Sequence, residues 1–129
     1  MPTLDDAARL AMALPDVTEG LKWRNRTWIV AGKGFVWERP LSKADVKRFG
    51  DETPPDGPFL AVRTADLGER QAIIAGNPTA FFTIAHFEGY PAFLIQLRKV
   101  TKKALGEAII DGWLACAPPK LAEAYLQNS

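Results

Sequence analysis

The sequence predicts an α+β protein, a two-layer α/β sandwich in which helices cover one face of a mainly antiparallel five-stranded sheet. Amphipathic stretches with helix-capping residues alternate with short segments rich in Trp, Ile, Val and Phe. Short turns join neighbouring strands, which favours antiparallel pairing. The expected order is α-β-β-β-α-β-β-α, with a minor helix after the second strand and another at the C-terminus. Three main helices suffice for one face, so the other face is expected to meet solvent, a partner subunit or a ligand.

The first elements are a helix and a hairpin. Thr3 is the expected N-cap of a helix that stops at Pro15, because apolar residues recur between them at helical spacing. Residues 22–30 are rich in Trp, Thr, Ile and Val and are predicted to form a strand. The turn 31–34 contains two glycines and leads into a second strand over 35–39, so these segments are predicted to pair as a hairpin.

A short helix, a loop and a strand–helix unit follow. Ser42 with an acid three residues later indicates a short capped helix, and residues 50–58 form a Pro-rich acidic loop that we expect at the surface. Residues 59–64 are the third predicted strand. Asp66 is the expected N-cap of the next helix, which Gly76 ends.

The C-terminal part is predicted to contain two strands and the longest helix. The strands cover 80–84 and 92–97, and the helix begins after Thr101. Its apolar stripe includes Cys116, which we expect to be buried and without a redox role. Two prolines at 118–119 then start a short last helix.

Composition excludes several classes of protein. The 129 residues fit one domain, 1–129, and carry 16 Lys and Arg against 15 Asp and Glu, with one His and one Cys. One Cys cannot form an intramolecular disulfide, and one His with one Cys cannot supply a structural zinc site, so no metal is expected. The acidic N-terminus is unlike a signal peptide, and no apolar run approaches the ~20 residues of a membrane span. We expect a cytoplasmic protein without a membrane partner.

Several segments carry a family resemblance in addition to a pattern of elements. They are LPDVTEG (14–20), Trp23, WIVAGKGFVWERPL (28–41), DGPFLAVRTADLGERQAII (56–74), FFTIAHFEGYPAFLIQL (81–97) and GWLACAPPKLAEAY (112–125). Together they resemble the MmcQ/YjbR family of small bacterial proteins. The resemblance implies a secretion-chaperone-like or frataxin-like fold of the YjbR type. Members are commonly labelled DNA-binding, on the idea that projecting hairpins form a double wing, and no reaction or cofactor comes with the family.

Charge is unevenly distributed along the chain. Residues 22–48 hold eight basic and two acidic residues, and residues 92–105 hold four basic residues and no acid. Nucleic-acid binding, with DNA as the expected partner, would therefore use these two blocks for phosphate contacts. The candidates are three residues expected to alternate along one face of a strand, one at the hairpin tip and three at a helix start, where free N–H groups attract anions: Lys22, Arg24, Arg26, Lys33, Arg98, Lys102 and Lys103. The alternative is that basic residues simply cluster on solvated faces.

Aromatic residues offer a second interpretation, a non-catalytic protein-interaction module that uses the open sheet face for a homodimer or a partner. Period-2 alternation places Phe35, Trp37 and Arg39 on one face, where they could equally stack bases or hold a small ligand. With the loop residues His86 and Tyr90, Trp37 and Arg39 form the predicted pocket or interface. His86 has neither a second His nor a nucleophile motif beside it, so no catalytic residue is assigned and an enzyme is not expected.

Overall fold

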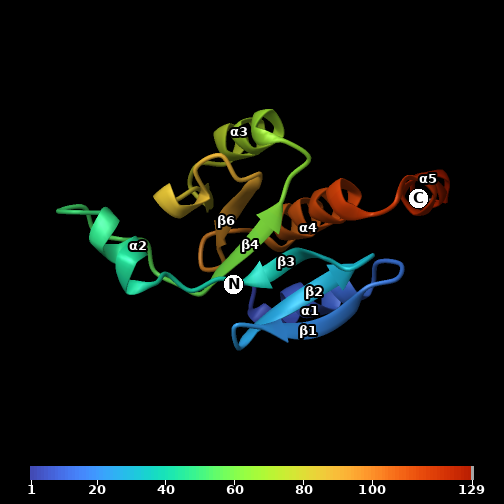
Figure 1. The fold of residues 1–129 in the computed structure, drawn as a ribbon, viewed down its shortest axis with the longest axis horizontal. Coiled ribbons are helices and arrows are strands. Elements are labelled where there is room, and N and C mark those ends of the chain that lie inside the picture. Colours follow the sequence, from blue (N-terminus) through green and yellow to red (C-terminus); the bar gives the residue numbers. More distant parts are fainter. Residues whose placement is uncertain (129) are drawn as a thin grey trace.

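The structure is a computed structural model and describes residues 1–128. It is an α+β fold with a six-stranded antiparallel open sheet, so the predicted fold class is confirmed and the predicted number of strands is one too low. The elements in chain order are α1 (Leu4–Met12), β1 (Thr18–Lys22), β2 (Asn25–Val30), β3 (Lys33–Glu38), α2 (Lys43–Arg48), β4 (Phe59–Arg63), α3 (Leu67–Gly76), β5 (Phe81–Phe82), the 3₁₀ turn η1 (Ala85–Phe87), β6 (Ala92–Gln96), α4 (Lys102–Cys116) and α5 (Pro119–Gln127) (Figure 1).

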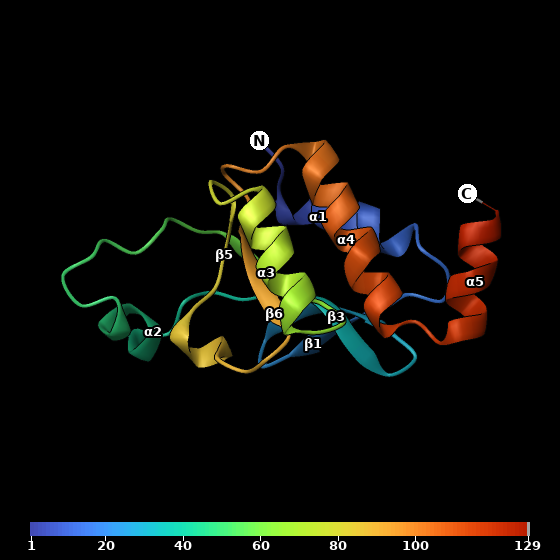
Figure 2. The same ribbon diagram turned by 90° about the horizontal axis from the view of Figure 1, so that it is seen from above.

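Two layers account for the architecture. The sheet has the strand order β1-β2-β3-β4-β6-β5, and every neighbouring pair is antiparallel. Figure 2 shows α1, α3 and α4 on one side of this sheet, with α2 apart from them. The core between the layers buries large side chains completely, among them Trp28, Phe93 and Trp113. Gly112 lets α4 approach the sheet closely, because a Cβ there would stand 2.6 Å from Cγ1 of Val62.

The helix starts predicted from the sequence are confirmed. The side chains of Thr3, Ser42, Asp66 and Thr101 each accept a hydrogen bond from the backbone N–H three residues later. Such a cap satisfies a backbone donor that the helix itself leaves unpaired, typically stabilising it by about 1 kcal/mol. These helix starts are therefore encoded locally.

The strand predicted over 22–30 is wrong in one respect, because a turn divides it. Trp23 and Arg24 form a two-residue turn between β1 and β2, with φ values of 52° and 67°. Positive φ at both central residues is the pattern of a type I′ hairpin turn, which normally uses Asn-Gly or Asp-Gly. Positions 23 and 24 carry neither of these dipeptides, so the sequence contains no signal for this turn. The predicted strand 80–84 is likewise shorter, since only β5 pairs and η1 follows it.

A bulge overturns the prediction that Phe35, Trp37 and Arg39 share one face. Trp28 pairs with Val36 but Ile29 pairs with Gly34, so Phe35 is an extra residue in β3. Phe35 and Val36 both pack in the core under the helices, whereas Trp37 packs against a second cluster on the opposite face. The alternation of side chains between the two faces, expected of a regular strand, is therefore interrupted at Phe35.

The face away from the main helices is open only in part. On this side, residues of β4 and β6 pack with the segment around η1 in a second apolar cluster. Its members are Ala61, Ile84, Phe87, Ala92 and Leu94. Phe49, directly after α2, packs against it, and α2 contacts η1. The uncovered part of this face is the region over β1, β2 and β3. Within residues 1–128, no helix combines the length and apolar character required to cross a membrane.

Candidate functional site

A groove of about 730 Å³ lies on the uncovered part of the sheet. Its lining includes all four residues of the predicted pocket, Trp37, Arg39, His86 and Tyr90, which come from the end of β3 and the residue after it, and from the segment around η1. Lys22, Trp23 and Arg48 line it as well. The structure thus brings together residues up to 68 positions apart in the sequence, from Lys22 to Tyr90.

Aromatic rings form one wall of the groove. The ring centroids of Trp37 and Tyr90 are 6.5 Å apart in an edge-on arrangement, and Phe87 lies 6.4 Å from Trp37 and 5.6 Å from Tyr90. Nη1 of Arg70 in α3 donates to the carbonyl oxygens of Phe87 and Tyr90, each at 2.8 Å. These charge-assisted bonds hold the loop in place, so the aromatic wall is built before any ligand arrives.

Arg39 is held at the groove by a buried carboxylate. Its Nη1 lies 2.9 Å from Oδ2 of Asp45, whose side chain is also 3.6 Å from Arg48. The Arg39 guanidinium lies 5.7 Å from the centre of the Phe87 ring and donates to the Pro40 carbonyl. Burial opposes ionisation of Asp45, but hydrogen bonds from Ser42 and Arg39 outweigh it, so the pKa of Asp45 is lowered. Asp45 therefore stays charged and positions Arg39.

The β1–β2 turn stands at the rim of the groove. Trp23 is 94% exposed and lines the groove, and its turn partner Arg24 is also exposed. Lys22 precedes them on the groove lining. An indole and two cations therefore occupy a single hairpin tip.

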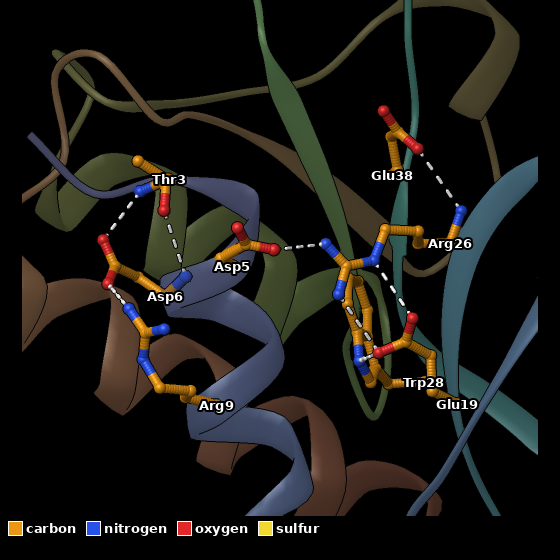
Figure 3. Close-up of polar contacts among 8 residues, drawn as sticks. All are labelled: Thr3, Asp5, Asp6, Arg9, Glu19, Arg26, Trp28 and Glu38. Carbon is orange, nitrogen blue, oxygen red and sulfur yellow. Dashed lines mark hydrogen bonds and ion pairs between the residues drawn. The ribbon is translucent and has the colours of Figure 1, made fainter.

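Arg26 is not available to the groove (Figure 3). Its guanidinium pairs with Asp5 at 2.9 Å and with Glu19 at 3.0 Å. Glu19 also accepts a hydrogen bond from the Trp28 indole, and chiefly because of the Arg26 bond its pKa is lowered. The turn places Arg26 opposite Leu21 and Lys22 opposite Asn25, so Lys22 and Arg26 face opposite sides of the sheet. The prediction that Lys22, Arg24 and Arg26 share one strand face is wrong for this reason.

The other predicted phosphate contacts lie away from the groove. Lys33 pairs with Val30 at the far end of the hairpin. Lys102 and Lys103 begin α4 in the helical layer, and Arg98 borders a separate hollow beside the 53–56 loop. Thr3 and Arg9 hydrogen-bond to Asp6 (Figure 3). Together with the charge of Lys102 they lower the pKa of Asp6, and the Thr3 backbone hydrogen bond contributes most. The acidic N-terminal turn of α1 therefore stands close to both Arg26 and Lys102, and the second basic block does not join the groove.

Comparison with known proteins gives a family. No family model matches the chain. The uncharacterised proteins Rv2570 and MT2646 of Mycobacterium tuberculosis, and Mb2600 of Mycobacterium bovis, are each 42% identical to it over 132 residues, covering 100% of this chain and 99% of theirs. The chain belongs to their family. Among solved structures, the Deinococcus radiodurans protein DR2400, described with a DUF419 domain, is 16% identical with a TM-score of 0.63 over 88% of this chain and 78% of that one. That likeness shows the fold alone.

Sequence reasoning missed two groove residues of this family member as binding candidates. The sequence does not predict that Trp23 is exposed at a binding surface, because this exposure depends on a turn that has no sequence signal. Arg48 reaches the groove through the packing of α2, which no local pattern predicts.

His86 is exposed, its ring lies 6.1 Å from Phe87, and its side chain has no hydrogen-bonding or ionic partner among residues 1–128. Cys116 is buried as predicted, and burial raises the pKa of its thiol.

Proposed function

We propose that this chain is a protein of the MmcQ/YjbR type that binds single-stranded DNA in the groove over β1, β2 and β3. The sequence segments that resemble this family support the assignment, as does a fold shared with a DUF419 protein, DUF419 being a YjbR/MmcQ-like family. The proposal keeps the expected DNA partner. It restricts the contact surface to the groove, which includes cations of the first basic block and none of the second.

The observation that carries the proposal is the Trp23–Arg24 turn. Two residues with side chains occupy positive φ, where each costs roughly 1–2 kcal/mol that glycine would largely avoid. The other hairpin turn, Ala31–Gly32, places a glycine at one of its two positive-φ positions. Exposing an indole to water adds to the cost. A Trp and an Arg in a strained, exposed turn are accounted for if they stack on bases and contact phosphates.

The electrostatics of the groove favour the same ligand. Among the described residues that line it are Lys22, Arg39 and Arg48, and none is Asp or Glu. The buried carboxylate of Asp45, 3% exposed, pairs with Arg39 and Arg48 and so offsets one of these three cations, which leaves the groove positively charged. Aromatic rings can stack only on unpaired bases, so a single strand fits this surface better than a duplex.

A binding titration tests the proposal. We expect a fluorescently labelled oligothymidine to gain anisotropy with the protein at low salt, and a matched duplex to bind more weakly. Trp23→Ala removes a stacking platform and should weaken binding roughly 5- to 100-fold, the range for one base–aromatic stack. Because Trp23 is almost fully exposed, the variant should fold normally. Met12→Ala, at an exposed apolar residue of α1, is the matched control and should bind like the wild type.

Two results would contradict the proposal. One is the absence of any binding at low salt, where phosphate contacts are strongest. The other is tight binding that Trp23→Ala leaves unchanged. A parallel titration with the RNA strand of the same sequence measures the preference between the two nucleic acids.

Protein interaction is the second candidate function, and the free edge of the sheet favours it. Among the described residues β1 pairs with β2 alone, and beside this edge Leu21 is 71% exposed and Trp23 is 94% exposed. An unprotected edge strand can accept a strand from another chain. If β1 mediates a homodimer, light scattering should give a concentration-dependent dimer that Trp23→Ala weakens. A strict monomer at high concentration would contradict it.

A further inference from the structure

Arg63, at the end of β4, is a partly buried cation without a counter-charge. Within residues 1–128 no carboxylate lies within ion-pairing distance of its guanidinium, whereas Arg26 and Arg39 each have one at 2.9 Å. Its single side-chain hydrogen bond is long, 3.5 Å from Nη1 to the Tyr90 hydroxyl. Its Nε is buried and has no hydrogen-bond partner within the described part of the chain. The charge and one donor of Arg63 are therefore left uncompensated.

Such an arrangement is costly in a folded protein. Buried polar groups are nearly always hydrogen-bonded, and partly buried charges are usually paired. The Arg63 side chain is nevertheless held in place, since its guanidinium lies 5.1 Å from the centre of the Tyr90 ring. Arg70 in turn fixes the Tyr90 backbone. Among residues 1–128 only Nη1 of the two terminal nitrogens of Arg63 makes a hydrogen bond, and Nη2 is not a buried atom, so Nη2 can donate to an anionic ligand group.

Arg63 lies along the line of the groove, beyond Trp37. The backbone N–H of Arg39 donates to Phe59 at the start of β4, and Arg63 is four residues further along that strand, or about 13 Å at the usual rise. Trp37 pairs with Ala61, midway between them. The order along the sheet is therefore a cation, an aromatic ring and a second cation. Tyr90 lines the groove and contacts both Trp37 and Arg63.

We propose that Arg63 and the Tyr90 hydroxyl form a second phosphate subsite. A single strand would then run along β3 and β4, with one phosphate at Arg39, a base on Trp37 and another phosphate at Arg63. This inference rests on the proposed function and deepens it. It names the path of the DNA strand across the sheet and a second phosphate contact, separated from the one at Arg39 by more than one phosphodiester linkage.

The salt dependence of binding tests the subsite. Each phosphate neutralised on a single strand contributes about 0.7 to the slope of log affinity against log salt. For an oligothymidine of about ten nucleotides, Arg63→Met should lower that slope by about 0.7 and weaken binding at low salt about tenfold or more. Arg63→Lys should keep the slope, because the charge remains. Lys120→Met removes an exposed cation of α5 and should leave both quantities unchanged.

A change in the ligand gives the same information without altering the protein. Neutral methylphosphonate linkages, introduced one at a time along the oligonucleotide, should weaken binding to the wild-type protein at two separated positions. Loss at one position alone, or at adjacent positions only, would overturn the inference even if Arg63→Met failed to fold. An unchanged salt slope in a folded Arg63→Met variant would overturn it as well. A wild-type protein that binds no oligonucleotide would instead overturn the proposed function itself.

Discussion

Asp45 joins the fold of this protein to its groove. The carboxylate accepts a hydrogen bond from the backbone N–H of Ser42, completing the cap of α2, and pairs with Arg39 and Arg48. One buried side chain therefore determines both where α2 packs and where two groove cations lie. Loss of the Asp45 carboxylate is therefore expected to lower both the stability of the fold and the affinity of the groove for its ligand.

Asp45→Asn should destabilise the protein by about 2 kcal/mol at pH 7, because it removes a charged partner from a partly buried ion pair. The pKa of Asp45 is lowered in the folded state, so this stabilisation is complete above the unfolded value near 4 and is lost as pH falls toward the folded value. Urea unfolding at pH 7 and at pH 3 should show the difference from wild type shrinking in acid. Asp51→Asn, in the exposed loop, serves as the control. An equal loss of unfolding free energy at pH 7 and at pH 3 would contradict the conclusion that ionised Asp45 stabilises the fold.

Asp111 on α4 should behave in the opposite way. Burial raises the pKa of Asp111, and the carboxylates of Glu69 and Glu107 raise it further. A raised carboxyl pKa means that ionisation opposes folding, so the penalty is present at neutral pH and disappears as pH falls and the group is protonated. Asp111→Asn should stabilise at pH 7, by less than about 1 kcal/mol given solvent screening, and have no effect in acid. Thermal melts at both pH values would measure this, and a lower melting temperature at pH 7 would be the contrary result.

At the scale of elements, the two hairpin turns allow stability and function to be separated. Replacing Trp23-Arg24 by Asn-Gly should relieve the positive-φ strain and stabilise the protein by about 1–2 kcal/mol. The same change should abolish the contribution of this turn to DNA binding. The matched control is Ala31→Asn, which also creates an Asn-Gly turn and should stabilise modestly without changing binding. A turn variant that is more stable and binds as well as wild type would exclude the turn from the binding surface.

The same elements show what could be predicted from the sequence. Helix starts were predictable because the cap and the donor it satisfies are three residues apart, as at Thr3 and Asp66. β1 was missed because the Trp23-Arg24 turn contains no turn-forming residue type, and the bulge at Phe35 was missed because nothing in a single strand marks it. Both errors changed which side chains share a face. The predicted pocket residues come together in one groove, whereas the predicted line of Lys22, Arg24 and Arg26 does not exist.

At the scale of the whole molecule, the cations that line the groove and those that begin α4 occupy different layers. The groove cations line the uncovered part of the sheet face, while Lys102 and Lys103 begin α4 in the helical layer. Figure 2 shows the start of α4 near the N-terminus of the chain. The small net charge of +1 therefore reflects a separated distribution of charge. Only the first block contributes side chains to the groove.

This separation predicts that the helix start is dispensable for binding. The double substitution Lys102→Gln and Lys103→Gln should change the affinity for a single strand by less than about twofold at physiological salt, where charges beyond about 8 Å are screened. Anisotropy titrations of this variant beside wild type would check it. A loss comparable to that of Trp23→Ala would mean that the nucleic acid contacts the helical layer instead.

The four tryptophans provide the most direct measurement of the central claim. Trp23 and Trp37 line the groove. Trp28 and Trp113 are fully buried in the core between the sheet and the helices, and they donate their indole N–H groups to Glu19 and the Pro15 carbonyl. In a titration with oligothymidine followed by the four indole N–H resonances in NMR spectra, we expect the signals of Trp23 and Trp37 to shift and those of Trp28 and Trp113 to stay. Binding that leaves Trp23 and Trp37 unmoved would contradict the account.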